Sequence, residues 1–400
     1  MNGTTEMTFA EFFAGIGLMR MGLERAGWQI KFANDIDEDK WQMYRDHFSN
    51  TGEFVIGDVH RLDVEQVPSV ALATASFPCN DLSLAGARKG LAGEQSSAFW
   101  GFIEVLTAMA KRRPNMVLLE NVPGFLTSND GNDFADALMA LNRLGYAVDA
   151  FIIDAVRFVP QSRQRLFVVG TKSAVVSELN DTPKFYESEC RPPALADFIL
   201  WHPEINWNIQ PLPPLPDNKP KLNDILQVLS PNSKTWWDPE RCNYLLNQMS
   251  VKHRAQADAM INGNSVTYGT VFRRVRNGKS MAELRTDGIA GCLRTPRGGS
   301  GRQILFAAGK GQFAVRLLTP RECARLMGAD NFVIKVPLNQ ALFGFGDAVC
   351  VPVIEWIAKN YLNPTWINKY AKEESASCGE TNINYFAKTR RQAKPVRSAG

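Results

Sequence analysis

A cysteine that follows a proline at the end of an apolar run is the first candidate for chemistry in this chain. Residues 70–77 are small and mostly apolar, which is typical of a buried parallel strand, and Pro78 cannot continue its hydrogen-bonded ladder. Pro78 thus delivers Cys79 into a loop at the edge where open parallel sheets carry out their chemistry. We interpret Cys79 as a nucleophile, although a single such cysteine is more often structural.

An acidic residue ends a second apolar run. Residues 115–119 are almost wholly apolar and lead into Glu120, Asn121 and Val122. At the tip of a buried strand the loss of water favours the protonated acid, which would allow Glu120 to donate a proton. The alternative, a surface acid at a strand end, does not account for the turn that follows.

Three shorter runs near the N-terminus also end in glycine or an acidic residue. They are residues 8–13, 30–33 and 54–56, and they lead to Gly15, Asp35 and Asp58, respectively. Asp35 lies 20 residues beyond Gly15, the spacing at which an acid reaches a ribose hydroxyl. The first turn lacks the third glycine of the dinucleotide fingerprint at its usual offset, so alone it could be a tight turn. Together the three ends favour an adenosine-bearing cofactor.

Alternating polar residues enter a further apolar strand, residues 166–169. Gln161, Arg163 and Arg165 fall on one face by the two-residue period of a strand. They predict a polar wall over a ligand, with an ordinary solvated strand edge as the alternative.

The composition favours a two-domain cytoplasmic enzyme. At 400 residues the chain exceeds the usual size of a single core. Its seven cysteines include no Cys-x-x-Cys pair, which argues against disulfides and a zinc site. None of the four histidines forms a recognisable pair with Cys79, which weakens an assignment as a Cys-His hydrolase. With no signal peptide and no apolar run judged long enough for a bilayer, we expect no membrane association.

Positive charge is concentrated in one window. Residues 271–310 hold nine basic and two acidic residues, whereas the whole chain has a net charge of only +4. Within the window, residues 294–302 are typical of a flexible loop whose arginines could reach DNA phosphates or base edges. These arginines are Arg294, Arg297 and Arg302. A solvated basic face is the alternative.

Two other segments are interpreted as structural. Thr319, Pro320 and Glu322 predict a capping box that starts a helix through Met327. The polar residues 371–400, with basic side chains near the end, predict a disordered tail.

Six short blocks, taken in order, resemble the DNA cytosine-5 methyltransferases of the prokaryotic or phage type. The blocks are FAGIG (13–17), Pro78-Cys79, ENV (120–122), QSRQR (161–165), RLLTPRECARLMG (316–328) and FGDAV (345–349). The chain departs from the family pattern twice. It has Asn80 where the family most often has glutamine after the nucleophile, and Asp347 where the last block usually reads Gly-Asn.

The resemblance implies a doubly wound, mostly parallel α/β sheet that binds S-adenosylmethionine, and a second, smaller target recognition domain. The implied catalytic domain is residues 1–180 and 315–370, and the implied recognition domain is residues 181–314. It further implies that S-adenosylhomocysteine is the product, that no metal is needed and that double-stranded DNA is the partner. The implied protein is a cytoplasmic monomer that associates with the nucleoid when it acts on DNA. Restriction-modification is one setting that fits this family, and a phage-borne or a solitary enzyme are the alternatives.

The resemblance also implies roles for individual residues. Cys79 would add to C6 of a flipped-out cytosine, Glu120 would hold or protonate N3, and Arg163 and Arg165 would border the pocket. The implied cofactor residues are Phe13, Ala14, Gly15, Ile16, Gly17, Leu18, Asp35, Ile36, Asp58, Val59, Pro78, Asp347, Ala348 and Val349. Arg294, Arg297 and Arg302 would contact DNA.

Three other classes of protein remain as alternatives. A nicotinamide dehydrogenase would share the sheet but gives Cys79 and Glu120 no joint role. A tRNA cytosine methyltransferase would share the catalytic blocks, whereas the basic insert favours duplex DNA. A noncatalytic DNA-binding module is disfavoured because both Cys79 and Glu120 are present.

Overall fold

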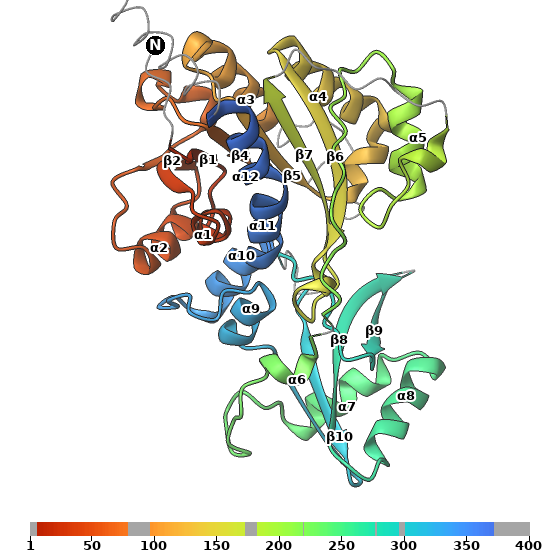
Figure 1. Ribbon diagram of the computed structural model, residues 1–400. Coiled ribbons are helices and arrows are strands. Elements are labelled where there is room, and N and C mark those ends of the chain that lie inside the picture. The colour runs from red at the N-terminus through yellow and green to blue at the C-terminus, as the bar shows by residue number, and fades with distance from the viewer. Residues whose placement is uncertain are drawn as a thin grey trace, which may run out of the picture.

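The computed structural model describes residues 6–78, 97–172, 182–218, 220–276, 278–295 and 301–371. They form a large α/β unit and a smaller unit that lies below it in Figure 1. The tail expected at residues 371–400 lies outside the described residues, except for its first residue.

The large unit is built on a seven-stranded sheet in the order β3-β2-β1-β4-β5-β7-β6. The strands are β1 (Thr8–Phe12), β2 (Gln29–Asp35), β3 (Phe54–Ile56), β4 (Leu72–Ala75), β5 (Met116–Asn121), β6 (Tyr146–Asp154) and β7 (Gln164–Lys172). The first five run parallel, and β7 runs antiparallel to both of its neighbours. The predicted α/β fold with a mostly parallel sheet is confirmed.

Both faces of this sheet are buried. Along β5, Met116 and Leu118 join one apolar cluster, whereas Val117 and Leu119 join another on the opposite face. This alternation follows from the two-residue period of a strand, and burial on both faces explains why the run is wholly apolar. The central strands are therefore rigid supports for whatever their ends carry.

Helices on the two faces provide the other half of these clusters. α1 (Leu18–Arg25) and α11 (Val351–Ile357) pack on one face, and α3 (Ser97–Ala108) and α4 (Asn132–Arg143) on the other. α2 (Glu38–His47) follows β2, and α10 (Leu338–Asp347) packs against it. The predicted capping box is confirmed at α9 (Pro320–Leu326), where Thr319 and Glu322 cap each other's backbone.

The small unit is a four-stranded antiparallel sheet in the order β11-β10-β8-β9 with two helices on it. Its elements are β8 (Thr267–Arg276), β9 (Lys279–Arg285), β10 (Ile304–Gly309), β11 (Gln312–Leu317), α7 (Pro239–Asn247) and α8 (Val251–Ile261). Leu245 and Ala257 of the helices meet Val271, Leu284 and Phe306 in one core cluster. The unit thus has an apolar core of its own. The short α6 (Leu222–Ile225) lies before it, against α9.

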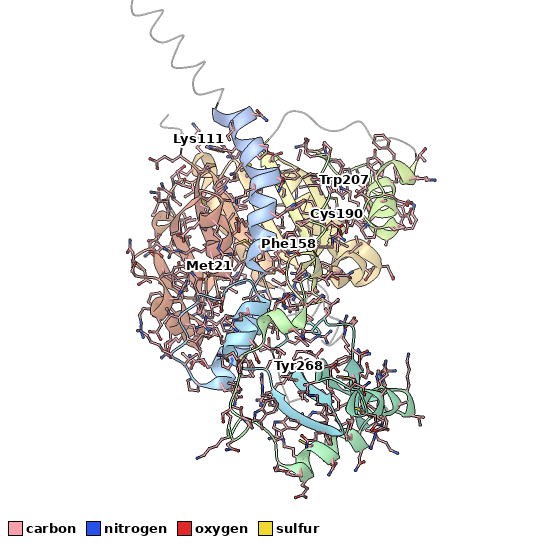
Figure 2. All side chains as sticks on the ribbon, turned by 60° about the horizontal axis from the view of Figure 1, so that its bottom comes forward. Met21, Lys111, Phe158, Cys190, Trp207 and Tyr268 are labelled. Atoms are coloured by element: carbon pink, nitrogen blue, oxygen red, sulfur yellow. The ribbon has the colours of Figure 1, made fainter. Side chains whose placement is uncertain are left out.

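The segment that precedes α6 packs on the large unit. α5 (Pro193–Trp201) and the fully buried Trp207 join the same cluster as α3 and α4, and Asn208 N donates to Val148 O of β6 at 2.7 Å. Figure 2 shows Cys190 and Trp207 in the large unit and Tyr268 in the small one. By packing, the small unit ends with β11 at Leu317.

A helical column closes the described chain. α10 and α11 are followed by η8 (Ala358–Leu362), α12 (Asn363–Thr365) and η9 (Trp366–Ala371), and Figure 1 shows the column along the large unit. Residues 338–368 are long and apolar enough to cross a membrane, but 67% of the most apolar window is buried inside the protein. Burial against α1 explains its apolar character without a membrane.

Candidate active site

The carboxyl ends of β1, β2, β4 and β5 meet at one edge of the large sheet. β1 lies between β2 and β4, and the helices that follow β1 and β4 cover opposite faces. Such a switch point opens the crevice where α/β sheets bind ligands. Phe13, Asp35, Pro78 and Glu120 all lie on or just beyond these four strand ends.

The chain turns sharply after β1. Phe13, Gly15 and Gly17 have φ values of 58°, 56° and 81°, in the left-handed region. A methyl group at Gly17 would lie 2.5 Å from the Phe48 ring, so the close packing there requires glycine. Over Gly15 the nearest atom to such a methyl is Lys40 Cδ at 3.8 Å, which leaves the backbone open to a ligand.

The side chains around these glycines point away from the crevice. Ala14, Ile16 and Leu18 are each at most 5% exposed. Only their backbone, at the start of α1, is therefore available to a ligand, and a helix N-terminus offers free N–H groups.

Asp35, at the end of β2, is fixed by two backbone donors. Gly15 N donates to its Oδ2 at 2.7 Å and Asp37 N to its Oδ1 at 2.9 Å. Asp35 is only 8% exposed, and burial raises the pKa of its carboxyl group against the opposing charge of Lys40. Each oxygen still has a lone pair for a further donor, such as a ribose hydroxyl.

The flanking predicted residues supply apolar and acidic contacts. Ile36 is 67% exposed, although it is large and apolar, and lies next to Asp35. Beyond β3, Asp58 Oδ1 accepts from His60 N at 3.0 Å, and Val59 is buried. Acceptors for hydroxyl and amino groups beside an exposed aliphatic side chain fit an adenosine-bearing ligand.

The end of β4 is tied to the end of β5. Asn121 Nδ2 donates to Phe77 O at 3.3 Å, and the Phe77 ring packs against Phe99 and Phe125. The described chain thus reaches Pro78, which is exposed, at the same edge as Glu120. Cys79 and Asn80, which follow, lie outside the described residues.

Glu120 is held by an arginine from the next strand. Arg165 Nε lies 2.8 Å from Glu120 Oε1, and the two side chains are 17% and 8% exposed. Glu120 is paired with Phe167 in the ladder between β5 and β7, so both residues sit on rigid strands. An oriented carboxylate at the mouth of a crevice can hold a ring nitrogen or an amino group.

Arg163 has a different environment, although it lies only two residues from Arg165. Its guanidinium is fully enclosed and donates to Leu293 O at 2.8 Å, Gly346 O at 3.1 Å and Ala348 O at 2.5 Å. Burial lowers its pKa, and the charge of Arg165 lowers it further. Arg163 therefore ties two distant segments, at Leu293 and at Gly346 to Ala348, to the start of β7. Nearby, Gln161 Nε2 donates to Leu326 O at 2.7 Å.

The comparisons with known proteins identify the family of this chain. The family of C-5 cytosine-specific DNA methylases matches residues 7–363, nearly the whole chain. The chain belongs to this family. It is therefore a DNA (cytosine-5) methyltransferase, as the six blocks predicted, and neither a dehydrogenase nor a noncatalytic module.

Curated relatives agree with this family. The chain is 28% identical to the type II methyltransferase M.DsaV of Dactylococcopsis salina, over 92% of this chain and 89% of that protein. It is 25% identical to the type II methyltransferase M.HhaI of Haemophilus parahaemolyticus, over 89% and 94% of the two chains. Among solved structures, the Dnmt2 methyltransferase of S. pombe has a TM-score of 0.58 at 18% identity, covering 90% of this chain and 99% of that one. That likeness supports the fold.

The last block of the methylase, residues 345–349, lies near the loop that follows β1, residues 13–17. Val349 is buried, and the oxygens of Gly346 and Ala348 are engaged by Arg163. Asp347, at the end of α10, instead turns toward α2, where its Oδ2 lies 2.9 Å from Lys40 Nζ. Although burial opposes its charge, Asp347 and Asp35 raise the pKa of Lys40.

Sequence reasoning missed a second cysteine at the site. Cys292 Sγ lies 3.3 Å from Arg163 Nη1. Burial opposes its ionisation, but Arg163, Arg165 and Arg294 together lower the pKa of this thiol. No local pattern marked it, because Arg163 and Arg165 are more than a hundred residues away in sequence.

Two of the three predicted DNA contacts, Arg294 and Arg302, lie where the two units meet. Arg294 is exposed, whereas Arg302 is half-buried and donates from Nη2 to Asn339 Oδ1 at 2.8 Å. Arg297 lies outside the described residues. The segment that carries Arg294 packs closely on the last block, residues 345–349. A methyl group added at Gly346 would lie only 2.7 Å from the Arg294 carbonyl carbon.

Proposed function

We propose that this methylase transfers a methyl group from S-adenosylmethionine to C5 of a flipped-out cytosine in a specific duplex DNA sequence, through a covalent bond between Cys79 and C6. The observation that carries the proposal is the shared edge of β1, β2, β4 and β5. There the Asp35 carboxylate, fixed by two backbone N–H groups, and the Glu120–Arg165 pair flank the chain that leads to Cys79.

The cofactor fits the β1–β2 side of this edge. Asp35 would accept the ribose hydroxyls, and Asp58 would accept the adenine amino group between Ile36 and Val59. The backbone of Ala14 to Leu18 would meet the amino-acid end, with Phe13 and Pro78 near the sulfonium and Asp347 to Val349 completing the site. When bound, S-adenosylmethionine supplies an electrophilic methyl group.

The base would enter on the β4–β5 side. C5 of cytosine is a poor nucleophile, so the Cys79 thiolate first adds to C6 and pushes the ring electrons toward C5. Glu120 holds N3 and the N4 amino group, which stabilises the charge that develops on the ring. After C5 has taken the methyl group, loss of the C5 proton to a base returns the electrons to the ring and breaks the bond to Cys79. The base must leave the helix stack for these contacts to form.

The two arginines would serve this chemistry in different ways. Arg165 touches Glu120 and so orients the group that holds the base. Arg163 is enclosed by carbonyl oxygens, and we assign it a positioning role, in which it fixes the cofactor segment and the segment before Arg294 relative to each other.

The small unit would recognise the target sequence. Its core is separate from the large sheet, and the described basic side chains of residues 271–310 are all at least partly exposed. The resemblance implies a boundary at residues 180/181 and 314/315, but α5 and Trp207 pack on the large unit and β11 continues to Leu317. We therefore propose residues 1–215 and 318–371 as the catalytic domain and the small unit as the recognition domain, with Arg294, Arg297 and Arg302 contacting DNA. The enzyme would act as a monomer in the cytoplasm, without a metal, as the modification partner of a restriction enzyme.

The test is methyl transfer from labelled S-adenosylmethionine to unmethylated genomic DNA and, in parallel, to unmodified tRNA. We expect label in DNA as 5-methylcytosine, confined to one short sequence when the methylated positions are read. Transfer to tRNA and none to DNA would favour a tRNA methyltransferase and contradict the proposal.

A further inference from the structure

Three side chains connect the cofactor edge to the beginning of residues 294–302, the segment proposed to contact DNA. Lys40 Nζ lies 2.9 Å from Asp347 Oδ2, and Thr295 Oγ1 donates to Asp347 Oδ1. We propose that Lys40, Asp347 and Thr295 form a bridge that couples cofactor binding to DNA binding, with Lys40 and Asp347 as positioning residues. The inference deepens the proposed function and rests on its assignment of the cofactor site.

The cofactor end of the bridge is crowded with carboxylates. Lys40 Nζ lies 2.9 Å from Asp347 and 4.0 Å from Asp37, and its charge also acts on Asp35. Asp37 in turn donates its backbone N–H to Asp35, the residue expected to hold the ribose. One ammonium thus balances three negative charges, so its loss would disturb the position of Asp35 through charge repulsion.

Lys40 also lies directly over the open backbone of the first loop. Its Cδ is the nearest atom above Gly15, where the amino-acid end of the cofactor is expected. A ligand that fills this space contacts the stem of Lys40 and therefore sets the position of its ammonium. Asp347 would move with that ammonium, because Lys40 holds its Oδ2 whereas Thr295 holds its Oδ1.

The DNA end of the bridge is equally constrained. Thr295 is the last described residue before the gap that contains Arg297, and its neighbour Arg294 is packed on Gly346. Arg163 fixes both segments of this contact by donating to Leu293 O and Gly346 O. A shift of Asp347 would thus be transmitted to Thr295, because the residues before Thr295 are held by these contacts.

Asp347 also explains one of the two departures from the family pattern. Where Gly-Asn is usual, an uncharged amide can donate as well as accept, whereas a carboxylate only accepts and needs a cation. Lys40 is that cation here. The side chains are 22% and 41% exposed, so the pair adds little to folding stability, and its effect should be found in ligand binding.

The experiment measures S-adenosylhomocysteine affinity by calorimetry with and without sheared DNA from cells that lack cytosine methylation. We expect DNA to strengthen binding to the wild type by a factor within the usual range of about 5 to 150. Lys40→Met should weaken binding about tenfold even without DNA. Lys40→Met combined with Asp347→Asn should recover most of that loss, because the unbalanced charge is removed. Thr295→Val should bind normally without DNA but lose most of the strengthening by DNA.

The matched control is Lys359→Met, which removes a lysine from an exposed pair with Glu355 on the helical column. It should change neither affinity nor coupling, and thermal unfolding should confirm that every variant is folded. The bridge is refuted if the double variant binds no better than Lys40→Met, or if Thr295→Val keeps the full strengthening by DNA. Absence of binding by the wild type would instead refute the cofactor assignment itself.

Discussion

Several charged side chains at the edge of the large sheet of this methylase are buried and paired, whereas those in the small unit are largely exposed. At the edge of the large sheet, Asp35, Glu120 and Arg163 are each buried and held by defined partners at 2.5–3.1 Å. In the small unit, Arg274 and Arg276 are more than half exposed and share the single acid Glu283. Chemistry needs groups fixed before the substrate arrives, whereas attraction to phosphates needs only charge within reach. Single substitutions should therefore have large effects at the edge and small ones in the small unit.

The largest effect is expected at Glu120. Glu120→Gln keeps the size of the side chain and can still accept from Arg165, but it cannot hold or protonate the ring in the same way. We expect kcat to fall by about 10²–10⁴-fold, with S-adenosylhomocysteine affinity unchanged within about twofold. Single-turnover methyl transfer and calorimetry measure the two quantities. The exposed Glu65→Gln is the control, and weakened cofactor binding by Glu120→Gln would mean that its role is misassigned.

Arg163→Met should mainly lower stability. The substitution removes the donor from three carbonyl oxygens, two of them in buried hydrogen bonds, and we expect a loss of about 3 kcal/mol in the free energy of unfolding. Arg254→Met, which breaks an exposed pair on α8, should cost less than about 0.5 kcal/mol. Urea denaturation measures the free energy of unfolding of both variants. Equal losses would show that burial of Arg163 does not make it more important for stability than the exposed Arg254.

Asp35→Ala should weaken S-adenosylhomocysteine binding by about 1–3 kcal/mol while the protein stays folded. Ribose hydroxyls donate to the ionised carboxylate, and burial raises the pKa of Asp35. Wild-type affinity should therefore fall as the pH is lowered, at a higher pH than for an ordinary aspartate. Calorimetry over a pH series measures both effects. A pH dependence that persists in Asp35→Ala would assign it to another group.

The smallest effects are expected for the arginines near the basic loop. Loss of a phosphate contact from Arg294, Arg297 or Arg302 should reduce the salt slope of DNA binding by about one unit on all sequences, whereas loss of a base contact should cost about 1–3 kcal/mol on the cognate site alone. Alanine variants on specific and random duplexes separate the two cases. If none of the three variants changes either quantity, recognition lies elsewhere in the small unit.

The same contrast explains what could be predicted from the sequence. The strand ends that carry Asp35, Asp58 and Glu120 are marked locally, by apolar runs that stop at an acid. The spacing of Gly15 and Asp35 predicted a contact to a ribose, whereas the hydrogen bond between the two residues is visible only in the fold. β6 was not anticipated. Neither was the antiparallel direction of β7, because an apolar run does not reveal which way a strand points.

Long-range partners were beyond the sequence. Arg163 was placed at the border of a pocket because of its neighbours, whereas its three carbonyl acceptors come from segments at Leu293 and at Gly346 to Ala348. Lys40 and Asp347 are about three hundred residues apart, and each alone looks like an ordinary surface charge. Only the fold shows that they meet at the cofactor edge.

The most direct test of the account is to trap the bond between the protein and the base. Duplex DNA in which 5-fluorocytosine replaces cytosine is incubated with the protein and S-adenosylmethionine, because fluorine at C5 cannot leave as a proton does and the adduct persists. We predict a denaturant-resistant complex whose cross-linked peptide contains Cys79, and which Cys79→Ala does not form although it still binds DNA. An adduct that survives in Cys79→Ala, or one that maps to Cys292, would contradict the account.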